Sequence, residues 1–313
     1  MIREAAAECK SFLNPPPKPA THCGVSLLCP VIATISAAAV LINTLAYAQR
    51  WRVKCAAGSN GEERIGLINA VLAFAAECAA LALLLATLPL GWWRSRHQTP
   101  PPAGNRSTII LIHGWGLNAA SCWWLRRRLQ QHGGHAVYCF AYSSWRVDVE
   151  AAAAQLHQLL AQMRAQPGDS CTLIGHSLGG LVARYCLRRY PARGVRRLIT
   201  LGTPHGGTLA APAWAPFVSR LRPEAAFMRR LNAGDRVPEQ FEVIAIHSRF
   251  DAHILPPENA EYPGACNIEV AGVGHNALLF SRRAATLIAE NLGPPCQGAY
   301  GQDARQRDTD RPG

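Results

Sequence analysis

The pattern of hydrophobic and polar positions changes once along the chain, close to residue 100. Before that point, two long apolar runs occupy residues 26–48 and 66–93, and they contain one acidic residue, Glu77. Beyond it, short β-rich runs alternate with segments of helical periodicity. Each long run exceeds the about 20 residues that a helix needs to cross a bilayer. The chain is therefore expected to combine a membrane part with an α/β domain.

The two long runs predict a transmembrane helical hairpin within residues 25–96, joined by a polar loop at residues 50–64. Two alternatives remain open. The first run could be a cleaved signal peptide, because Ala46-Tyr47-Ala48 fits an A-x-A cleavage site, and the second could be a buried soluble helix. A charged Glu77 would be costly at the middle of a bilayer, so we expect it to be protonated or to face the other helix.

Six β-rich runs predict strands, and four segments of helical periodicity predict helices between them. The strands are expected at residues 108–112, 136–142, 171–175, 197–201, 241–247 and 267–271. The helices are expected at residues 122–132, 147–166, 178–189 and 282–292. Such alternation is typical of a mainly parallel sheet with helices on both faces. We predict an α/β fold for residues 108–293.

The remaining segments predict a flexible leader at residues 1–24, a linker at 97–107 and a disordered tail at 294–313. Residues 208–240 interrupt the α/β alternation and are expected to form a small cap. This cap is amphipathic, with arginines opposite its apolar side chains. It could be a lid that opens at lipid or a cap that simply packs on its domain.

Length and charge limit the classes of function. The chain has 313 residues and a formal net charge of +12, but no zinc spacing or basic helix with interleaved aromatics accompanies that charge, so nucleic acid is not an expected partner. The eleven cysteines lack C-x-x-C pairs and histidines at ligand spacing, so no metal site is predicted. Free thiols and the basic residues around the hairpin slightly favour a cytoplasmic α/β domain at a bacterial inner membrane.

The candidate chemistry begins at residues 175–179, GHSLG, which fit the G-x-S-x-G nucleophile elbow between an expected strand and an expected helix. A serine hydroxyl needs an adjacent base, and the base needs a carboxylate that orients it. Asp251 and His275 follow the last two expected strands, in the order that such a sheet requires. We predict Ser177 as nucleophile, His275 as base and Asp251 as its orienting partner.

The negative charge of a tetrahedral intermediate needs preorganised backbone N–H donors. One should belong to Leu178, directly after the nucleophile, and the other to Trp115, in the loop after the first strand of the domain. Trp115 should also cover the acyl pocket, and the other predicted substrate-binding residues are His176, Trp214 and Phe217.

The chain resembles the α/β-hydrolase superfamily, in particular bacterial triacylglycerol lipases and related lipase-like esterases. The resemblance lies in the stretches IHGWG at residues 112–116, GHSLGG at 175–180 and GTPHGGT at 202–208, in Asp251 with LPP at 255–257, and in Gly274-His275. It covers residues 105–293 and implies a Ser177–Asp251–His275 triad with Trp115 and Leu178 as oxyanion-hole donors. The N-terminal hairpin and the lack of an Asp-rich calcium loop depart from such lipases.

Together these features predict a membrane-anchored serine hydrolase that cleaves carboxylic esters of apolar acyl groups without a metal or organic cofactor. Its expected partners are a lipid or apolar ester substrate and the bilayer. Acyl transfer or thioester hydrolysis on the same triad is an alternative. A non-catalytic membrane interaction module that retains an inherited fold is another.

Overall fold

A computed structural model describes residues 23–57, 66–94, 107–131, 135–163, 170–191, 194–234, 237 and 240–293. The expected tail, all but the last residue of the expected linker and residues 1–22 of the expected leader lie outside these ranges. The last two leader residues belong to the first helix, and Ser107 begins the first strand.

Six parallel strands form one sheet in the order β2-β1-β3-β4-β5-β6. The strands are β1 (Ser107–Ile112), β2 (Ala136–Phe140), β3 (Ser170–His176), β4 (Val195–Leu201), β5 (Glu242–His247) and β6 (Cys266–Glu269). Because all strands are parallel, their carboxyl ends meet at one edge of the sheet. The predicted parallel α/β sheet is confirmed.

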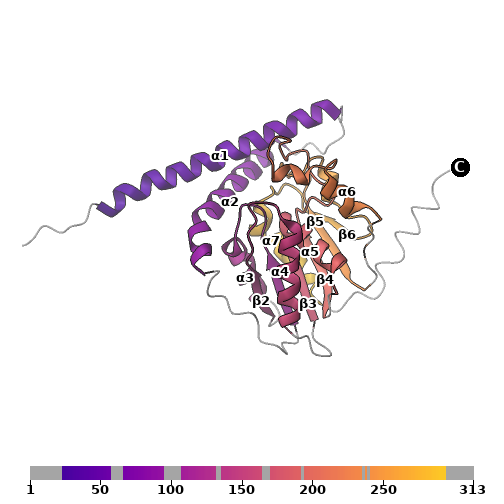
Figure 1. Cartoon of the computed structure of the whole chain (residues 1–313). Coiled ribbons are helices and arrows are strands. Elements are labelled where there is room, and N and C mark those ends of the chain that lie inside the picture. Colours follow the sequence, from indigo (N-terminus) through magenta and orange to yellow (C-terminus); the bar gives the residue numbers. More distant parts are fainter. Residues whose placement is uncertain are drawn as a thin grey trace, which may run out of the picture.

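Helices cover both faces of this sheet (Figure 1). They are α3 (Trp123–Gln130), α4 (Val149–Gln162), α5 (Leu178–Arg189), α6 (Ala226–Asn232) and α7 (Arg282–Glu290), with short 3-10 turns η2 (Ala119–Cys122), η3 (Val218–Leu221), η4 (Pro257–Ala260) and η5 (Ala277–Phe280). Alternate side chains of β1 serve the two faces, as period-2 geometry requires. Ile110 packs toward α4 and α5, whereas Ile109 and Leu111 pack toward α3 and α7.

Two long helices precede the sheet, α1 (Cys23–Ala57) and α2 (Leu67–Arg94). Both are long and apolar enough to cross a membrane, a test that signal sequences and core helices of soluble proteins also pass. They cross where Asn43 donates to the Cys78 sulfur at 3.7 Å and where the rings of Tyr47 and Phe74 meet at 5.4 Å. Beyond this crossing, the apolar side chains of α1 toward its N-terminus are exposed, as at Val31 and Leu41.

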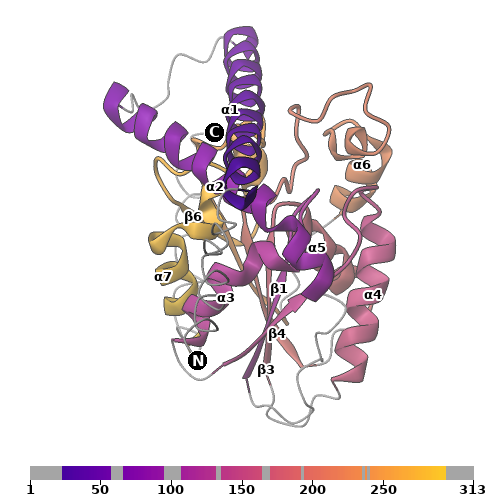
Figure 2. The same ribbon diagram turned by 90° about the vertical axis from the view of Figure 1, so that its left-hand side faces the viewer.

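The part of α2 from Glu77 to Leu88 lies against the sheet domain (Figure 2). Leu84 is 1% exposed and joins the core cluster of α3 and α7, and Asn118 of the domain donates to the Leu88 carbonyl at 2.8 Å. Glu77 is also 1% exposed, and its carboxylate accepts hydrogen bonds from Asn276 and Ala277. Glu77 therefore has hydrogen-bond partners in the loop after β6, in addition to lying between the two helices and the domain.

The expected cap divides into a packed and an exposed part. Phe227, Met228 and Leu231 of α6 are buried against the domain, as a simply packed cap requires. The segment before η3 instead exposes aromatic side chains, since Trp214 is 86% and Phe217 47% exposed. The apolar residues of this region therefore do not form one continuous buried face.

Candidate active site

Ser177 lies in the turn between β3 and α5 with φ 53° and ψ −123°. A non-glycine residue at such a positive φ costs about 1–3 kcal/mol and persists only where the surroundings enforce it. The turn is tight enough that a Cβ atom on Gly175 would clash with the Gly180 backbone. The sharp turn thus holds the serine side chain out at the carboxyl edge of the sheet, in the arrangement of a nucleophile elbow.

Three side chains from the carboxyl edge form a chain of hydrogen bonds. His275 Nε2 lies 3.0 Å from Ser177 Oγ, and His275 Nδ1 lies 2.6 Å from Asp251 Oδ2. Ser177 follows β3, Asp251 follows β5, and His275 follows β6. With the proton of the neutral imidazole on Nδ1, this ring donates to Asp251 and leaves Nε2 free to accept from the serine hydroxyl.

The carboxylate of Asp251 is 1% exposed and is bonded through both oxygens. Its Oδ1 accepts from the backbone N–H groups of His253, at 2.6 Å, and Ile254, at 3.1 Å. Gly202, at the end of β4 with φ 51°, lies beneath the pair, and a Cβ there would stand 3.3 Å from both Asp251 Oδ2 and His275 Nδ1. These contacts leave Oδ2 directed at the imidazole.

The pKa values of His275 and Asp251 are shifted in opposite directions. Burial alone would lower the pKa of His275, but the nearby carboxylates of Asp251 and Glu77 outweigh it and raise that pKa above its ordinary value. Burial would raise the pKa of Asp251, but the charge and hydrogen bond of His275 outweigh it and lower that pKa. Asp251 is therefore ionised at neutral pH and stabilises an imidazolium at position 275.

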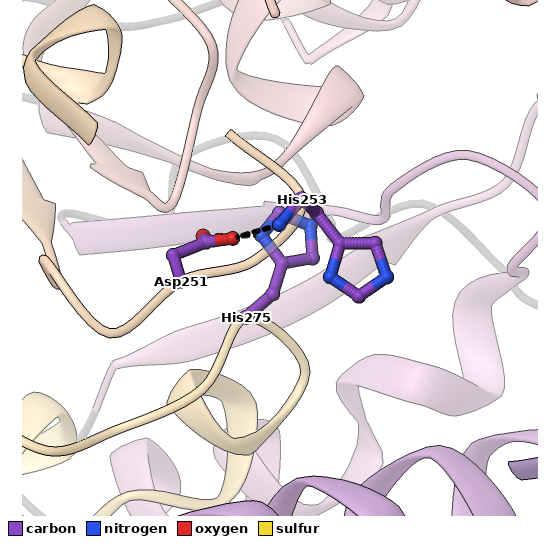
Figure 3. Close-up of side chains that lie close together, drawn as sticks. All are labelled: Asp251, His253 and His275. Carbon is purple, nitrogen blue, oxygen red and sulfur yellow. Dashed lines mark hydrogen bonds and ion pairs between the residues drawn. The ribbon is translucent and has the colours of Figure 1, made fainter. Parts of the chain in front are cut away.

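His253 lies beside this pair (Figure 3), with its ring 4.7 Å from the ring of His275. Burial, followed by the charge of His275, lowers the pKa of His253 to about 4, so the ring is neutral at physiological pH. Asp251, His253 and His275 could present one ligand atom each within 4.8 Å of one another. Asp251 Oδ2 and His275 Nδ1 already bond each other. The cluster is therefore explained by this hydrogen-bonded pair.

The predicted oxyanion-hole donors lie on two sides of the nucleophile. Leu178 is the first residue of α5, so its N–H belongs to the helix end whose donors have no intrahelical partner. The loop after β1 passes close by, since a Cβ on Gly114 would stand 3.1 Å from Ser177 Cβ. Trp115 follows Gly114, and its indole Nε1–H donates to the Trp145 carbonyl at 3.2 Å.

The predicted substrate-binding residues do not share one environment. Trp115 is 43% exposed, and Trp214 and Phe217 are exposed on the cap. His176 is 2% exposed, with its Nε2 3.1 Å from the His275 carbonyl oxygen. The ring of His176 lies 4.9 Å from the ring of His275, so His176 packs against the base, and its contact with substrate stays a prediction.

The structure also adds contacts that sequence reasoning missed. Besides Glu77 of α2, two residues of α1 bond the loop that precedes Asp251. The Tyr47 hydroxyl donates to the Phe250 carbonyl at 3.1 Å, and the Arg50 guanidinium donates to the Arg249 carbonyl at 2.8 Å. The one available signal was the single acidic residue in the second apolar run; nothing local indicated the partners.

A family model and several curated proteins are similar in sequence to part of this chain. A model of the Alpha/beta hydrolase family matches residues 109–263. Pimeloyl-[acyl-carrier protein] methyl ester esterase of Aliivibrio fischeri is 33% identical over 117 residues, which is 37% of this chain and 41% of that protein. Triacylglycerol lipase of Burkholderia plantarii is 31% identical over 147 residues, 41% of this chain and 40% of that protein. The chain thus spans less than half the length of either curated relative.

Solved structures share the fold at low sequence identity. A mature Bacillus licheniformis lipase superposes with a TM-score of 0.53 at 18% identity, over 63% of this chain and 96% of that one. Aspergillus fumigatus lipase B gives a TM-score of 0.55 at 18% identity, over 62% of this chain and 55% of that one. With its parallel sheet, its strand–serine–helix turn and the match of residues 109–263 to the family model, the sheet domain has the α/β-hydrolase fold and resembles that superfamily.

Proposed function

We propose that this protein is a membrane-attached serine hydrolase that cleaves carboxylic esters of apolar acyl groups through an acyl-enzyme. The observation that carries the proposal is the continuous chain from Ser177 Oγ to His275 Nε2, at 3.0 Å, and from His275 Nδ1 to Asp251 Oδ2, at 2.6 Å. A hydroxyl becomes a useful nucleophile when a base accepts its proton and a carboxylate stabilises that base.

In the proposed reaction, Ser177 Oγ attacks the ester carbonyl carbon while its proton passes to His275 Nε2. The N–H groups of Leu178 and Trp115 stabilise the resulting oxyanion, each contributing about 2.7–4 kcal/mol in comparable sites. The imidazolium then protonates the leaving alcohol, and an acyl-enzyme remains. Water attacks the acyl carbonyl with His275 as base, and the serine leaves with the proton as the acid is released.

Apolar acyl groups are favoured by the aromatic side chains around this edge. Trp115 is 43% exposed directly after Gly114, and Trp214 and Phe217 are exposed on the cap. The names of the relatives, a methyl ester esterase and a triacylglycerol lipase, support carboxylic esters as the substrate class. Ester hydrolysis is therefore favoured over the non-catalytic interpretation.

The proposed reaction can be tested with p-nitrophenyl esters of increasing acyl length and the full chain in detergent. We expect kcat/KM to rise by up to about fourfold per added methylene while the chain fits the pocket, since burying a CH₂ group contributes about 0.8 kcal/mol. Added alcohol should not divert the acyl group from water. The proposal would be refuted if the chain hydrolysed no member of the series and also failed to react with a serine-reactive probe.

We assign membrane attachment to the exposed apolar surface of α1, with α2 connecting it to the hydrolase domain. Leu41 and Leu45 are 60% and 62% exposed, although both are apolar and lie in a run long enough to cross a bilayer. Residues toward the C-terminal end of α1, by contrast, bond the active-site loops. The domain would then sit at the bilayer surface, close to an acyl ester held in lipid.

Alkaline carbonate extraction of membranes tests this attachment. The wild-type chain is expected to stay in the membrane pellet, whereas Leu41→Asp/Leu45→Asp is expected to enter the soluble fraction, because each aspartate costs about 2.5–3.5 kcal/mol at mid-bilayer. Leu41→Ala/Leu45→Ala is the matched control and should stay in the pellet. Release of the wild type by carbonate would contradict the attachment.

A further inference from the structure

Glu77 of α2 is bonded to the loop that carries His275. Its Oε1 accepts from the backbone N–H of Asn276 at 2.8 Å and from Asn276 Nδ2 at 2.7 Å, and its Oε2 accepts from the backbone N–H of Ala277 at 2.8 Å. The side chain is 1% exposed, and the loop backbone approaches so closely that a Cβ on Gly274 would clash with the Glu77 carboxyl group. The carboxylate thus bonds the backbone directly after His275 and lies against the backbone directly before it, at Gly274.

The three groups that bond Glu77 are all donors, which is the complement of an ionised carboxylate, an acceptor through both oxygens. Charge-assisted bonds of this kind are stronger than neutral ones, and a buried carboxylate that lost them would be costly. These hydrogen bonds therefore favour one position of the loop at Asn276 and Ala277. His275 directly precedes these two residues, so its position is fixed with theirs.

The same contact changes the electrostatics of the imidazole. Four titratable side chains face His275: Asp251 after β5, His253 in the same loop as Asp251, His176 at the end of β3 and Glu77 of α2. Burial lowers the pKa of His176 to about 3 and that of His253 to about 4, so neither carries charge at neutral pH. Asp251 and, after it, Glu77 raise the pKa of His275. Burial raises the pKa of Glu77 itself, and its hydrogen bonds from Asn276 and Ala277 act against that rise by stabilising the ionised form.

We propose that Glu77 is a positioning residue for His275, so that α2 of the hairpin completes the active site of the hydrolase domain. The inference rests on the proposed function, because it assigns Glu77 a role in the reaction of Ser177 and His275. Glu77 touches neither the substrate nor the reacting atoms. It acts by fixing the loop at residues 274–277 and by placing a negative charge near the base.

Glu77→Gln removes the charge and turns an amide NH₂ donor toward backbone donors, whereas Glu77→Asp keeps the charge on a shorter side chain. Leu84→Ala is the matched control, because Leu84 is equally buried in the same helix but contributes only apolar packing to the core and no hydrogen bond to the His275 loop. Each full-length variant is measured by kcat/KM against pH with a p-nitrophenyl ester, and each rate is divided by the number of sites that a fluorophosphonate titrates.

We expect Glu77→Gln to lower kcat/KM per titrated site by up to about a hundredfold, the scale of a displacement of about 1 Å at a reacting group. Its ascending pH limb should move to lower pH, because a carboxylate that raises the pKa of His275 has been removed. Glu77→Asp should lose rate but keep the limb nearer the wild-type position. Leu84→Ala should lose stability but keep both the rate per site and the limb.

Two results would overturn the proposal: a Glu77→Gln enzyme with the wild-type rate and limb, or a Leu84→Ala enzyme whose limb moves as far as that of Glu77→Gln. If Glu77→Gln yields no titratable sites, Glu77→Asp is compared with Leu84→Ala instead. A Glu77→Asp enzyme with the wild-type rate per site and the wild-type pH limb would then overturn the proposal. A wild-type chain that neither hydrolyses the ester nor reacts with the probe would instead refute the proposed function.

Discussion

Replacing Ser177 by alanine is expected to reduce kcat for ester hydrolysis by about 10⁶-fold, the scale found when a serine protease loses its nucleophile. The alanine methyl group offers His275 Nε2 no proton and the ester carbonyl no nucleophile, although the imidazole and the oxyanion donors remain. Covalent labelling by a fluorophosphonate should disappear with the activity. Both are measured on the full chain in detergent, with circular dichroism to monitor folding.

Ser170→Ala provides the matched control, because Ser170 begins the same strand, β3, at the opposite edge of the sheet. This variant should hydrolyse the ester and react with the probe as the wild type does. Labelling of Ser177→Ala at the wild-type rate would assign the nucleophile to another residue, and the proposed mechanism would fail.

Asp251→Asn is expected to lower kcat/KM by about 10⁴-fold while the fold is retained, as when the triad carboxylate of a serine protease is made neutral. Asp251 Oδ1 accepts from the N–H groups of His253 and Ile254, so the asparagine would keep its oxygen there and turn its NH₂ toward His275 Nδ1. Nδ1 would then accept, Nε2 would carry the proton, and the base for Ser177 would be lost.

The pH profile adds a sign to this prediction. Asp251 raises the pKa of His275 through its charge and its hydrogen bond, and a base must be neutral to act. The residual activity of Asp251→Asn should therefore reach its plateau at lower pH than the wild type. Glu258→Gln, an exposed carboxylate of η4, serves as the control and should leave rate and profile unchanged. A loss of less than tenfold in Asp251→Asn would remove Asp251 from its assigned role.

The hairpin does more than provide the proposed membrane attachment, because it is hydrogen-bonded to the loops of the proposed active site. α1 bonds the loop before Asp251 through Tyr47 and Arg50, and α2 bonds the loop after His275 through Glu77. The base of the proposed reaction, His275, and its orienting carboxylate, Asp251, therefore both lie in loops that the hairpin contacts. A membrane-attached α1 would connect the geometry of the site to the bilayer through two short hydrogen-bonded paths.

Local pattern was sufficient for most of the sheet domain. The helix predicted at residues 178–189 begins and ends as the structure has it, and all six strands begin and end within two residues of their predicted limits because alternating apolar residues and turn residues define them locally. The strand predicted to reach residue 142 stops at Phe140, since the Tyr142 side chain leaves the ladder and its hydroxyl donates to the His113 carbonyl.

The sequence by itself determined the class of fold, the serine turn and the order in which Ser177, Asp251 and His275 reach the same edge, because each depends on short-range periodicity and on parallel strands ending together. Only the tertiary structure decided that His176 bonds the His275 carbonyl and that Glu77 bonds the loop after His275. Those contacts join residues about a hundred or more positions apart, and hydropathy along one helix carries no information about which distant N–H groups will meet its single carboxylate.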